Sequence, residues 1–405
     1  MTYLQGLNTD WKEFGPIKSL ENSDYLNNAK YFTRISSLMS TIRANIPPYT
    51  SKNSSRAVNF DIRDECFKGK NYKRAVIYLL SNGCEWARKS ACGCTMCGHL
   101  TKQTRSHEPL NGSETIEQIK REFKKIDFNK IPILNLYNNG SFYNPNEIPS
   151  DVRTKILQII NSEKYINTLV VESRPEFINE EVIKETRRII PEKRIEIAIG
   201  LETVDDFARI ISINKGFNLK QFDEAAAIIS KYDLNLRVYV LLKPPFFSEK
   251  EAILEAIRTI KYAFSAGAAT VSLEAVTVQP YTLTEYLFSN GLYELPWLWS
   301  IVEVIRETYN LGKICLGLFQ FYPPPNYVPH NCAKCSDKIF DGMNKYNQTL
   351  DINSFEGISC ECSKIWEQVL ESSGNSFFDN IRKFKRHLDT IDILETSSGL
   401  RVLHN

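Results

Sequence analysis

The sequence predicts an α/β fold, a partial (β/α)6 barrel of the TIM type with an N-terminal helical cover and a small C-terminal metal-binding subdomain. Six short apolar runs alternate with helical segments after residue 74, no comparable strand pattern precedes them, and four cysteines cluster after residue 330. Alternation of this kind is typical of a barrel whose loops after the strands carry the chemistry, with a doubly wound sheet as the alternative. We expect a cover over 1–73, a core barrel over 74–284 and a C-terminal extension over 285–405.

The predicted strands are rich in aliphatic and β-branched residues and are bounded by turn residues. They occupy residues 74–80, 131–138, 166–173, 194–202, 235–244 and 268–278. Charged and apolar residues at helical spacing predict helices between these strands over 181–190, 219–232 and 249–267, the last with Gly267 at its end. Further on, residues 295–310 predict a Trp-rich helix, and residues 312–319 leave one more short strand open.

The composition is that of an ordinary globular protein. Hydrophobic residues make up 42% of the chain, charged residues 24%, and the formal net charge is +2, which excludes disordered and collagen-like classes. No apolar run approaches the roughly 20 residues that span a bilayer, and residues 1–14 lack the order of a signal peptide. We therefore expect a cytoplasmic protein without a membrane segment. Residues 51–125 carry 15 Lys and Arg against eight Asp and Glu, a basic excess suited to RNA phosphates.

Eight of the ten cysteines form two groups. In a reducing compartment such spacing indicates metal binding or catalysis before disulfides. Cys84 follows the first predicted strand, nine residues separate it from Cys94, and two residues separate Cys94 from Cys97. Three thiolates on one loop can hold three irons of a 4Fe-4S cluster and leave the fourth iron open to an outside ligand. A closed zinc site that recruits Cys92 or His99 is the alternative; otherwise Cys92 is a small apolar filler.

The second group is a pair of cysteine pairs. Cys332 and Cys335 are separated by two residues, and Cys360 and Cys362 follow them with one residue between. This pattern resembles a split zinc knuckle, in which four thiolates form one tetrahedral shell, and His330 is a candidate substitute for one of them. Four thiolates also satisfy an auxiliary iron–sulfur cluster, and four reduced cysteines in a small core remain the purely structural alternative.

The first cysteine loop and four later stretches resemble the radical S-adenosylmethionine (SAM) enzymes. The spacing is similar to the Elongator-type branch, whose motifs occur in the same order: NNGSF (138–142), ESRPE (172–176), GLET (200–203) and INKG (213–216). Together with CTMCG, YVLLKPPF, LPWLWS, PHNC and CECSKIW, these motifs resemble the radical subunit of archaeosine synthase over residues 74 to 370. Two segments depart from that family's pattern, LEAVTVQP (273–280) and YPPPNYVPHNC, and both border the expected substrate side.

The resemblance implies which side chains hold the cofactors. Cys84, Cys94 and Cys97 would bind the 4Fe-4S cluster, with SAM on the open iron. Glu172 would receive the methionyl ammonium, Lys215 the methionyl carboxylate and Glu202 the ribose hydroxyls. The remaining residues implied in SAM binding are Met96, Asn139, Gly140, Ser141 and Arg174. Taken singly, each has a structural explanation, such as a helix cap for Glu202. Strand alternation leaves open whether Tyr239 and Lys243 face the barrel lumen, and no substrate-side catalytic residue is assigned.

The resemblance also implies a function. Such an enzyme cleaves SAM reductively to a 5′-deoxyadenosyl radical, and this family cleaves a carbon–nitrogen bond of a lysine adduct on a 7-deazaguanine base in tRNA, leaving an amidine. The implied partners are tRNA or a modified nucleoside, a lysine-transferring subunit, and a reductant such as ferredoxin or flavodoxin. One alternative is radical SAM chemistry on a small metabolite or peptide. The other is a zinc-stapled binding protein that is not an enzyme.

Overall fold

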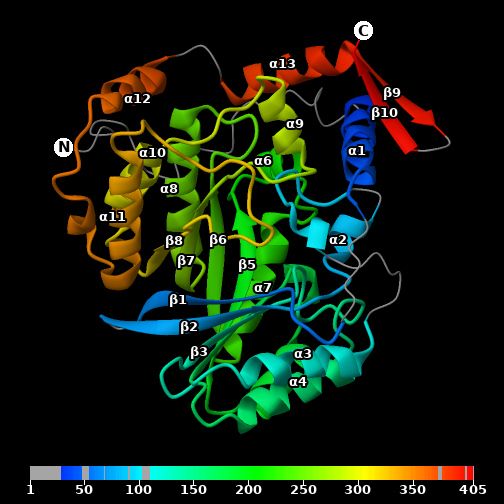
Figure 1. Ribbon diagram of the computed structural model, residues 1–405, viewed down its shortest axis with the longest axis vertical. Helices are drawn as coiled ribbons and strands as arrows, with labels where there is room; N and C mark the ends of the chain where they lie inside the picture. Colours follow the sequence, from blue (N-terminus) through cyan, green and yellow to red (C-terminus); the bar gives the residue numbers. More distant parts are fainter. Residues whose placement is uncertain are drawn as a thin grey trace.

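The computed structural model describes residues 29–47, 54–67, 69–89, 92–102, 110–372, 376–396 and 399–404. At its centre lies an eight-stranded sheet whose strands neighbour one another in chain order, from β1 to β8 (Figure 1). Successive strands from β2 to β8 pair in parallel, whereas β1 pairs with β2 in the antiparallel sense. A doubly wound sheet would reverse its strand order at a switch point, so the predicted partial barrel is confirmed.

The six predicted strands correspond to β2 to β7. The further strand that residues 312–319 left open is the short strand β8. The strands are β1 (Asn59–Phe67), β2 (Lys70–Tyr78), β3 (Ile133–Tyr137), β4 (Thr168–Glu172), β5 (Arg194–Glu202), β6 (Asn235–Leu242), β7 (Ala268–Ala275) and β8 (Ile314–Leu316). Because parallel strands of a barrel end at one rim, the loops after β2 to β8 meet there.

Strand β1 is an element that the sequence analysis did not anticipate within residues 1–73. It pairs along its whole length with β2, from Asn59 opposite Tyr78 to Phe67 opposite Lys70. Its charged residues concealed it, since Glu65 is only 4% exposed and yet lies in a strand. Three cations compensate this buried carboxylate, namely Arg74, Arg237 and Lys313. The last part of the predicted cover is therefore part of the sheet.

The predicted helices correspond to α5, α7, α8 and α10, and their ends follow ordinary capping rules. The α-helices are α1 (Ala29–Ala44), α2 (Glu85–Arg88), α3 (Gly112–Phe123), α4 (Ser150–Ser162), α5 (Glu180–Ile189), α6 (Asp206–Ala208), α7 (Leu219–Lys231), α8 (Glu249–Ser265), α9 (Leu283–Ser289), α10 (Leu298–Thr308), α11 (Ser336–Thr349), α12 (Cys362–Glu371) and α13 (Phe377–Asp389). Helix α8 begins at the capping box of Ser248 and Glu251, and the chain leaves it through Gly267 at a φ of +89°.

Short helical turns complete the chain: η2 (His99–Lys102), η3 (Pro175–Phe177), the π-turn η4 (Arg209–Ile213) and η5 (Ile352–Phe355). The two ends of the described chain lie side by side, because α1 packs against the hairpin of β9 (Ile391–Thr396) and β10 (Gly399–His404) (Figure 1). Arg34 of α1 forms an ion pair of 2.6 Å with Asp389 at the end of α13. The cover helix is thus fixed to the C-terminal extension.

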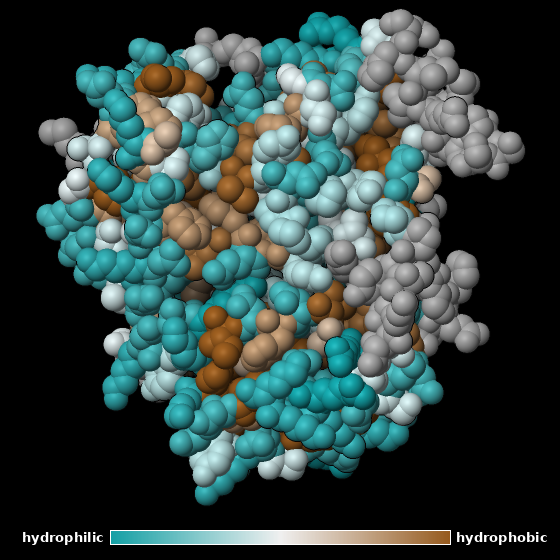
Figure 2. Space-filling view, in the orientation of Figure 1, coloured by the Kyte–Doolittle hydropathy of each residue, from teal (hydrophilic) through white to brown (hydrophobic). Residues whose placement is uncertain are grey.

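Hydrophilic side chains predominate on the face drawn in Figure 2, and hydrophobic ones gather mainly toward its middle. Among the described helices, none combines the length and the apolar character that crossing a bilayer requires. The expectation for residues 1–14 lies outside the described residues. The division into cover, barrel and extension stays a prediction.

Candidate active site and metal centre

A cavity of about 390 Å³ opens where the parallel strands end. Side chains from the ends of β4 and β5, from the loops after β2 and β3, and from β7 and β8 line it together. This is the rim at which barrel enzymes place their chemistry. The predicted site residues among its lining are Cys84, Cys94, Met96, Cys97, Asn139, Gly140, Glu172, Arg174, Glu202 and Lys215. The structure therefore brings together residues from five separate stretches of the chain.

The cysteine loop is held against the π-turn η4. The backbone N–H of Thr95 donates to the carbonyl of Ile213 at 3.0 Å, and its hydroxyl donates to that of Ser212 at 2.6 Å. The indole N–H of Trp86 donates to the Asn214 carbonyl at 2.8 Å. Because Lys215 follows Asn214 directly, these bonds fix the loop and Lys215 relative to each other.

The thiols of Cys84 and Cys97 in this loop are poor acids. Burial, together with the nearby Glu147 and Cys94, raises the pKa of Cys84 to about 12. Burial and Cys94 also raise the pKa of Cys97. Such thiols stay protonated at neutral pH until a cationic group stabilises the thiolates. Cys92 is half-buried at a φ of +58° and does not line the cavity.

Glu147, which the sequence analysis missed, joins the cysteine loop to the segment after β3. Its carboxylate accepts backbone N–H bonds from Glu85, at 2.8 Å, and from Ser141, and a side-chain amide bond from Asn138 at 3.1 Å. A Cβ on residue 140 would collide with this carboxylate and lie 3.1 Å from the Cys84 Cα, so only glycine fits at Gly140. The motif NGSFYNPNEIP contained Glu147 but no signal of its role.

The predicted acidic and basic residues form two neighbouring arrangements at the rim. Lys215 and Glu202 form an ion pair of 2.6 Å with side chains only 14% and 7% exposed. Burial alone would lower the pKa of Lys215, but the Glu202 carboxylate outweighs it and raises that pKa. Glu172 accepts a hydrogen bond from the Tyr239 hydroxyl at 3.0 Å, and burial raises the pKa of Glu172 to about 7. Tyr239 also lies 3.2 Å from the Tyr137 hydroxyl.

Two further predicted residues, Arg174 and Ser141, differ in their relation to the cavity: Arg174 lines it and Ser141 does not. Arg174 donates to the Lys215 carbonyl at 2.7 Å and to Glu176 at 2.6 Å, and its guanidinium lies 5.1 Å from the Trp86 ring centroid. Ser141 is fully buried behind the cavity lining, where its hydroxyl accepts the Arg174 backbone N–H at 3.2 Å.

The structure answers the question left open for strand β6. Tyr239 lines the cavity, whereas Lys243 pairs with Glu249 at 2.7 Å and does not. Lys243 follows the end of the strand at a φ of +58°, where the strict alternation of side chains no longer applies.

Glu274 on β7 is another cavity residue that the sequence analysis did not single out. Burial raises its pKa to about 7, partly offset by Arg63 and Arg74, and no hydrogen bond or ion pair joins it to a residue that the structure describes. Gly317 on the β8 side leaves the space that its carboxylate occupies. Glu274 lies within the segment 273–280, which departs from the family pattern.

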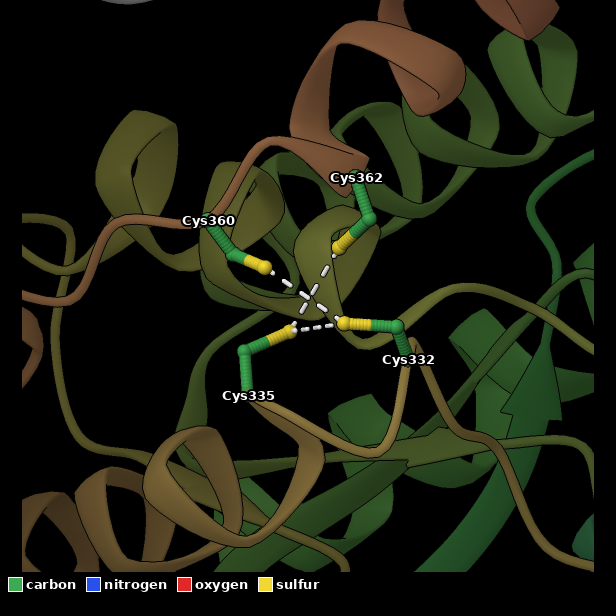
Figure 3. Close-up of side chains that lie close together, drawn as sticks. All are labelled: Cys332, Cys335, Cys360 and Cys362. Atoms are coloured by element: carbon green, nitrogen blue, oxygen red, sulfur yellow. Dashed lines mark hydrogen bonds between the residues drawn. The ribbon is translucent and has the colours of Figure 1, made fainter.

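The second cysteine group converges on one point (Figure 3). The sulfur atoms of Cys332 and Cys360 are 3.4 Å apart, those of Cys335 and Cys362 are 3.5 Å apart, and all four lie within 4.8 Å of one another. Four sulfurs at about 2.3 Å from one tetrahedral ion would lie about 3.8 Å apart, so the spacing fits a single metal ion. His330 is exposed and bonds the Val328 carbonyl, so it takes no part.

In the described part of the chain, this is the one group of potential ligands at single-ion spacing. Cys84, Cys94 and Cys97 surround the cavity instead, so the closed zinc site with Cys92 or His99 does not form there. Two residues support the C-terminal group, because the Trp299 indole donates to the Cys362 sulfur at 3.4 Å and the Asn331 amide to the Cys335 sulfur at 3.7 Å.

No protein-family model matches the chain. The chain is 33% identical over 306 residues to archaeosine synthase subunit beta of Methanosarcina acetivorans, a match that covers 75% of this chain and 86% of the relative. It is 30% identical over 309 residues to the protein of that name from Thermococcus kodakarensis, with 75% and 94% covered. Among solved structures, methylornithine synthase aligns over 95% of both chains with a TM-score of 0.48 and 13% identity.

Proposed function

The chain belongs to the archaeosine synthase subunit beta family, a family of enzymes, and on this premise we propose that it is a radical SAM enzyme of tRNA modification. Family membership confirms the resemblance found in the sequence and overturns the non-enzymatic alternative. One observation carries the proposal: three cysteines and seven further residues, named from motif order alone, line a single cavity.

Cys84, Cys94 and Cys97 hold a 4Fe-4S cluster in this proposal. The set of three thiols supports it, since three ligands leave one iron for an outside molecule. Their placement around a cavity, rather than at single-ion spacing, favours a multi-atom cluster. Burial, which keeps Cys84 and Cys97 protonated without metal, also excludes water from a bound cluster.

SAM binds beside the cluster in the same cavity, whose volume is within the range of small-molecule sites. When bound, the reduced cluster and SAM supply a 5′-deoxyadenosyl radical that abstracts a hydrogen from the substrate. Glu172 accepts from the methionyl ammonium, and the Tyr239 hydroxyl orients its carboxylate. Lys215 and Glu202, now paired with each other, separate to take the methionyl carboxylate and the ribose hydroxyls.

Binding of SAM should depend on pH through Glu172, whose pKa of about 7 lies above that of an ordinary glutamate. The methionyl ammonium requires the ionised carboxylate, so binding below pH 7 must first remove a proton. We expect the Kd for SAM to rise about tenfold between pH 8 and pH 6. The measurement is isothermal titration calorimetry on the reconstituted protein.

Two variants test the source of this pH dependence. Glu172→Gln should bind SAM weakly at both pH values and lose most of the dependence. Glu274→Gln is the matched control, because Glu274 also has a pKa of about 7 but is not assigned to SAM, and it should keep the dependence. A tenfold dependence retained in Glu172→Gln would contradict the assignment.

The substrate in this proposal is tRNA that carries a lysine adduct on a 7-deazaguanine base, which the enzyme cleaves at a carbon–nitrogen bond to leave an amidine. The relatives' name, archaeosine synthase, supports a role in this tRNA modification, and their designation as a subunit supports a partner subunit, which in this proposal transfers the lysine. The basic excess within residues 51–125 suits tRNA phosphates. Ferredoxin or flavodoxin would supply the electron. Radical SAM chemistry on a small metabolite or peptide is the second candidate, favoured by the segment 273–280.

Anaerobic reconstitution tests the chemistry. We expect about four irons per chain and conversion of SAM to 5′-deoxyadenosine under dithionite. Mass spectrometry of nucleosides from tRNA of a deletion strain tests the substrate, and the amidine nucleoside should disappear. An unchanged digest alongside 5′-deoxyadenosine formation would favour the small-molecule alternative, and a protein that binds no iron would contradict the proposal.

The C-terminal four-cysteine site binds zinc in this proposal, because its sulfur spacing suits one tetrahedral ion better than a multi-iron cluster. The site joins the start of α11 to the start of α12, so a bound ion would hold these two helices together. Metal binding at such a site contributes directly to folding.

Cys335→Ser should therefore remove zinc and lower Tm by several degrees. The protein should still bind about four irons per chain at the first cysteine loop. Elemental analysis and a thermal melt measure both effects. Cys66→Ala is a suitable control, since Cys66 is a buried thiol of β1 outside the four-cysteine group, and it should keep about one zinc per chain. A Cys335→Ser protein that keeps its Tm but loses activity and some iron would instead indicate an auxiliary iron–sulfur cluster.

A further inference from the structure

Arg43, in the last turn of α1, reaches from the N-terminal cover into the cysteine loop. Its Nη2 donates to the Cys94 carbonyl at 3.1 Å. The guanidinium lies within electrostatic range of the thiols of Cys92, Cys94 and Cys97. The cover helix therefore places a cation against the loop that holds the proposed cluster.

The other terminal nitrogen of Arg43 has no partner among the residues that the structure describes. Nη1 is buried and forms no hydrogen bond with the residues that the structure describes, and no carboxylate among them pairs with Arg43. A buried guanidinium nitrogen without an acceptor is costly, so its surroundings normally supply one. The neutral thiols around it are weak acceptors, so they do not satisfy the N–H groups of Nη1.

Two other cations that line the cavity near the loop are already engaged. Lys215 pairs with Glu202 at 2.6 Å, and Arg174 donates to Glu176 and to the Lys215 carbonyl. Arg43 thus differs from both in having neither a carboxylate partner nor a second acceptor in the described chain. A cluster held by three thiolates is net negative and gains one more negative charge on reduction, so it would provide what Arg43 lacks.

We propose that Arg43 is a positioning residue that sets the reduction potential of the 4Fe-4S cluster, its unpartnered Nη1 donating to a cluster sulfur. This inference rests on the proposed function. The positive charge stabilises the reduced cluster more than the oxidised one, because the reduced cluster carries the larger negative charge. Arg43 therefore raises the potential and makes the cluster easier to reduce.

The test is an electron paramagnetic resonance titration of the anaerobically reconstituted protein with dithionite. Arg43→Met removes the charge and both donors while keeping an unbranched chain. We expect it to lower the reduction equilibrium about tenfold, which is about 59 mV toward negative potential for one electron. Arg43→Lys keeps the charge but not the paired donors, so it should shift the potential in the same direction by less.

Arg34→Met is the matched control, because Arg34 lies on the same helix but pairs with Asp389 and the Ile391 carbonyl. It should leave the potential unchanged, which separates the charge effect from loosened docking of α1. An unchanged potential in Arg43→Met with four irons bound overturns this inference alone. If Arg43→Met fails to hold the cluster, Arg43→Gln, which removes the charge but keeps a polar side chain, replaces it, and a wild-type potential in Arg43→Gln overturns the inference. A wild-type protein without iron overturns the proposed function as well.

Discussion

Cys94→Ala should abolish both cluster binding and 5′-deoxyadenosine formation. Cys94 lines the cavity with Cys84 and Cys97 and lies within electrostatic range of both. Loss of a supporting residue around a metal site typically costs 10- to 100-fold in affinity or activity, so loss of a ligand should cost more than about 100-fold. Iron content and the rate of 5′-deoxyadenosine formation under dithionite measure the effect.

Cys92→Ala is the control for this prediction, since it removes a thiol from the same loop. Cys92 does not line the cavity, whereas Cys84, Cys94 and Cys97 do. The variant should keep about four irons and at least half of the wild-type rate. Iron loss in Cys92→Ala, or an active Cys94→Ala enzyme, would show that the ligand set is wrong.

The sequence was sufficient to predict which strand ends carry the cavity residues. Glu172 ends β4 and Glu202 ends β5, and parallel strands of a barrel end at one rim, so motifs far apart in the chain had to meet. The four C-terminal cysteines were predictable for a related reason, because two close pairs can form one tetrahedral shell with little constraint on the segment between them.

Residues that act across the fold were not predictable in this way. Strands β1 and β2 separate Arg43 from the cysteine loop along the chain, and Arg43 belongs to no motif. Only the packing of α1 brings it to Cys94. Glu147 lies in the segment after β3, where an acidic residue alone indicates no particular role. Its role depends on four hydrogen-bond donors that converge on its carboxylate in space. Ser141 shows the converse, since its motif implied a place in SAM binding but its side chain is fully buried and does not line the cavity.

Strand β1 illustrates how burial of charge defeats pattern reading. Alternating apolar and charged residues predict one solvent-facing side, yet the inward side of β1 presents Glu65 to three cations of the barrel floor. Arg237 continues the arrangement to Glu196, 2.9 Å away. Buried ion pairs thus join β1 to β2, β5, β6 and the segment before β8.

Glu65→Gln should strongly destabilise the protein for this reason. The substitution leaves Arg74, Arg237 and Lys313 without their shared carboxylate, and breaking a buried ion pair typically costs about 3–5 kcal/mol. Urea unfolding followed by circular dichroism measures the loss. Asp64→Asn is the matched control, because Asp64 is the neighbouring residue and pairs with the half-exposed Lys73, so its loss should cost less than about 1 kcal/mol.

The pH dependence of the wild-type protein tests the same network without a variant that might aggregate. Burial alone would raise the pKa of Glu65, but its three cations outweigh burial and hold that pKa well below the ordinary value. A carboxylate with a lowered pKa stabilises the fold above its unfolded-state pKa, so stability should fall as pH drops below about 5. Glu65→Gln should flatten this acid limb. A Glu65→Gln protein with wild-type stability and an unchanged acid limb would mean that the three cations need no shared carboxylate.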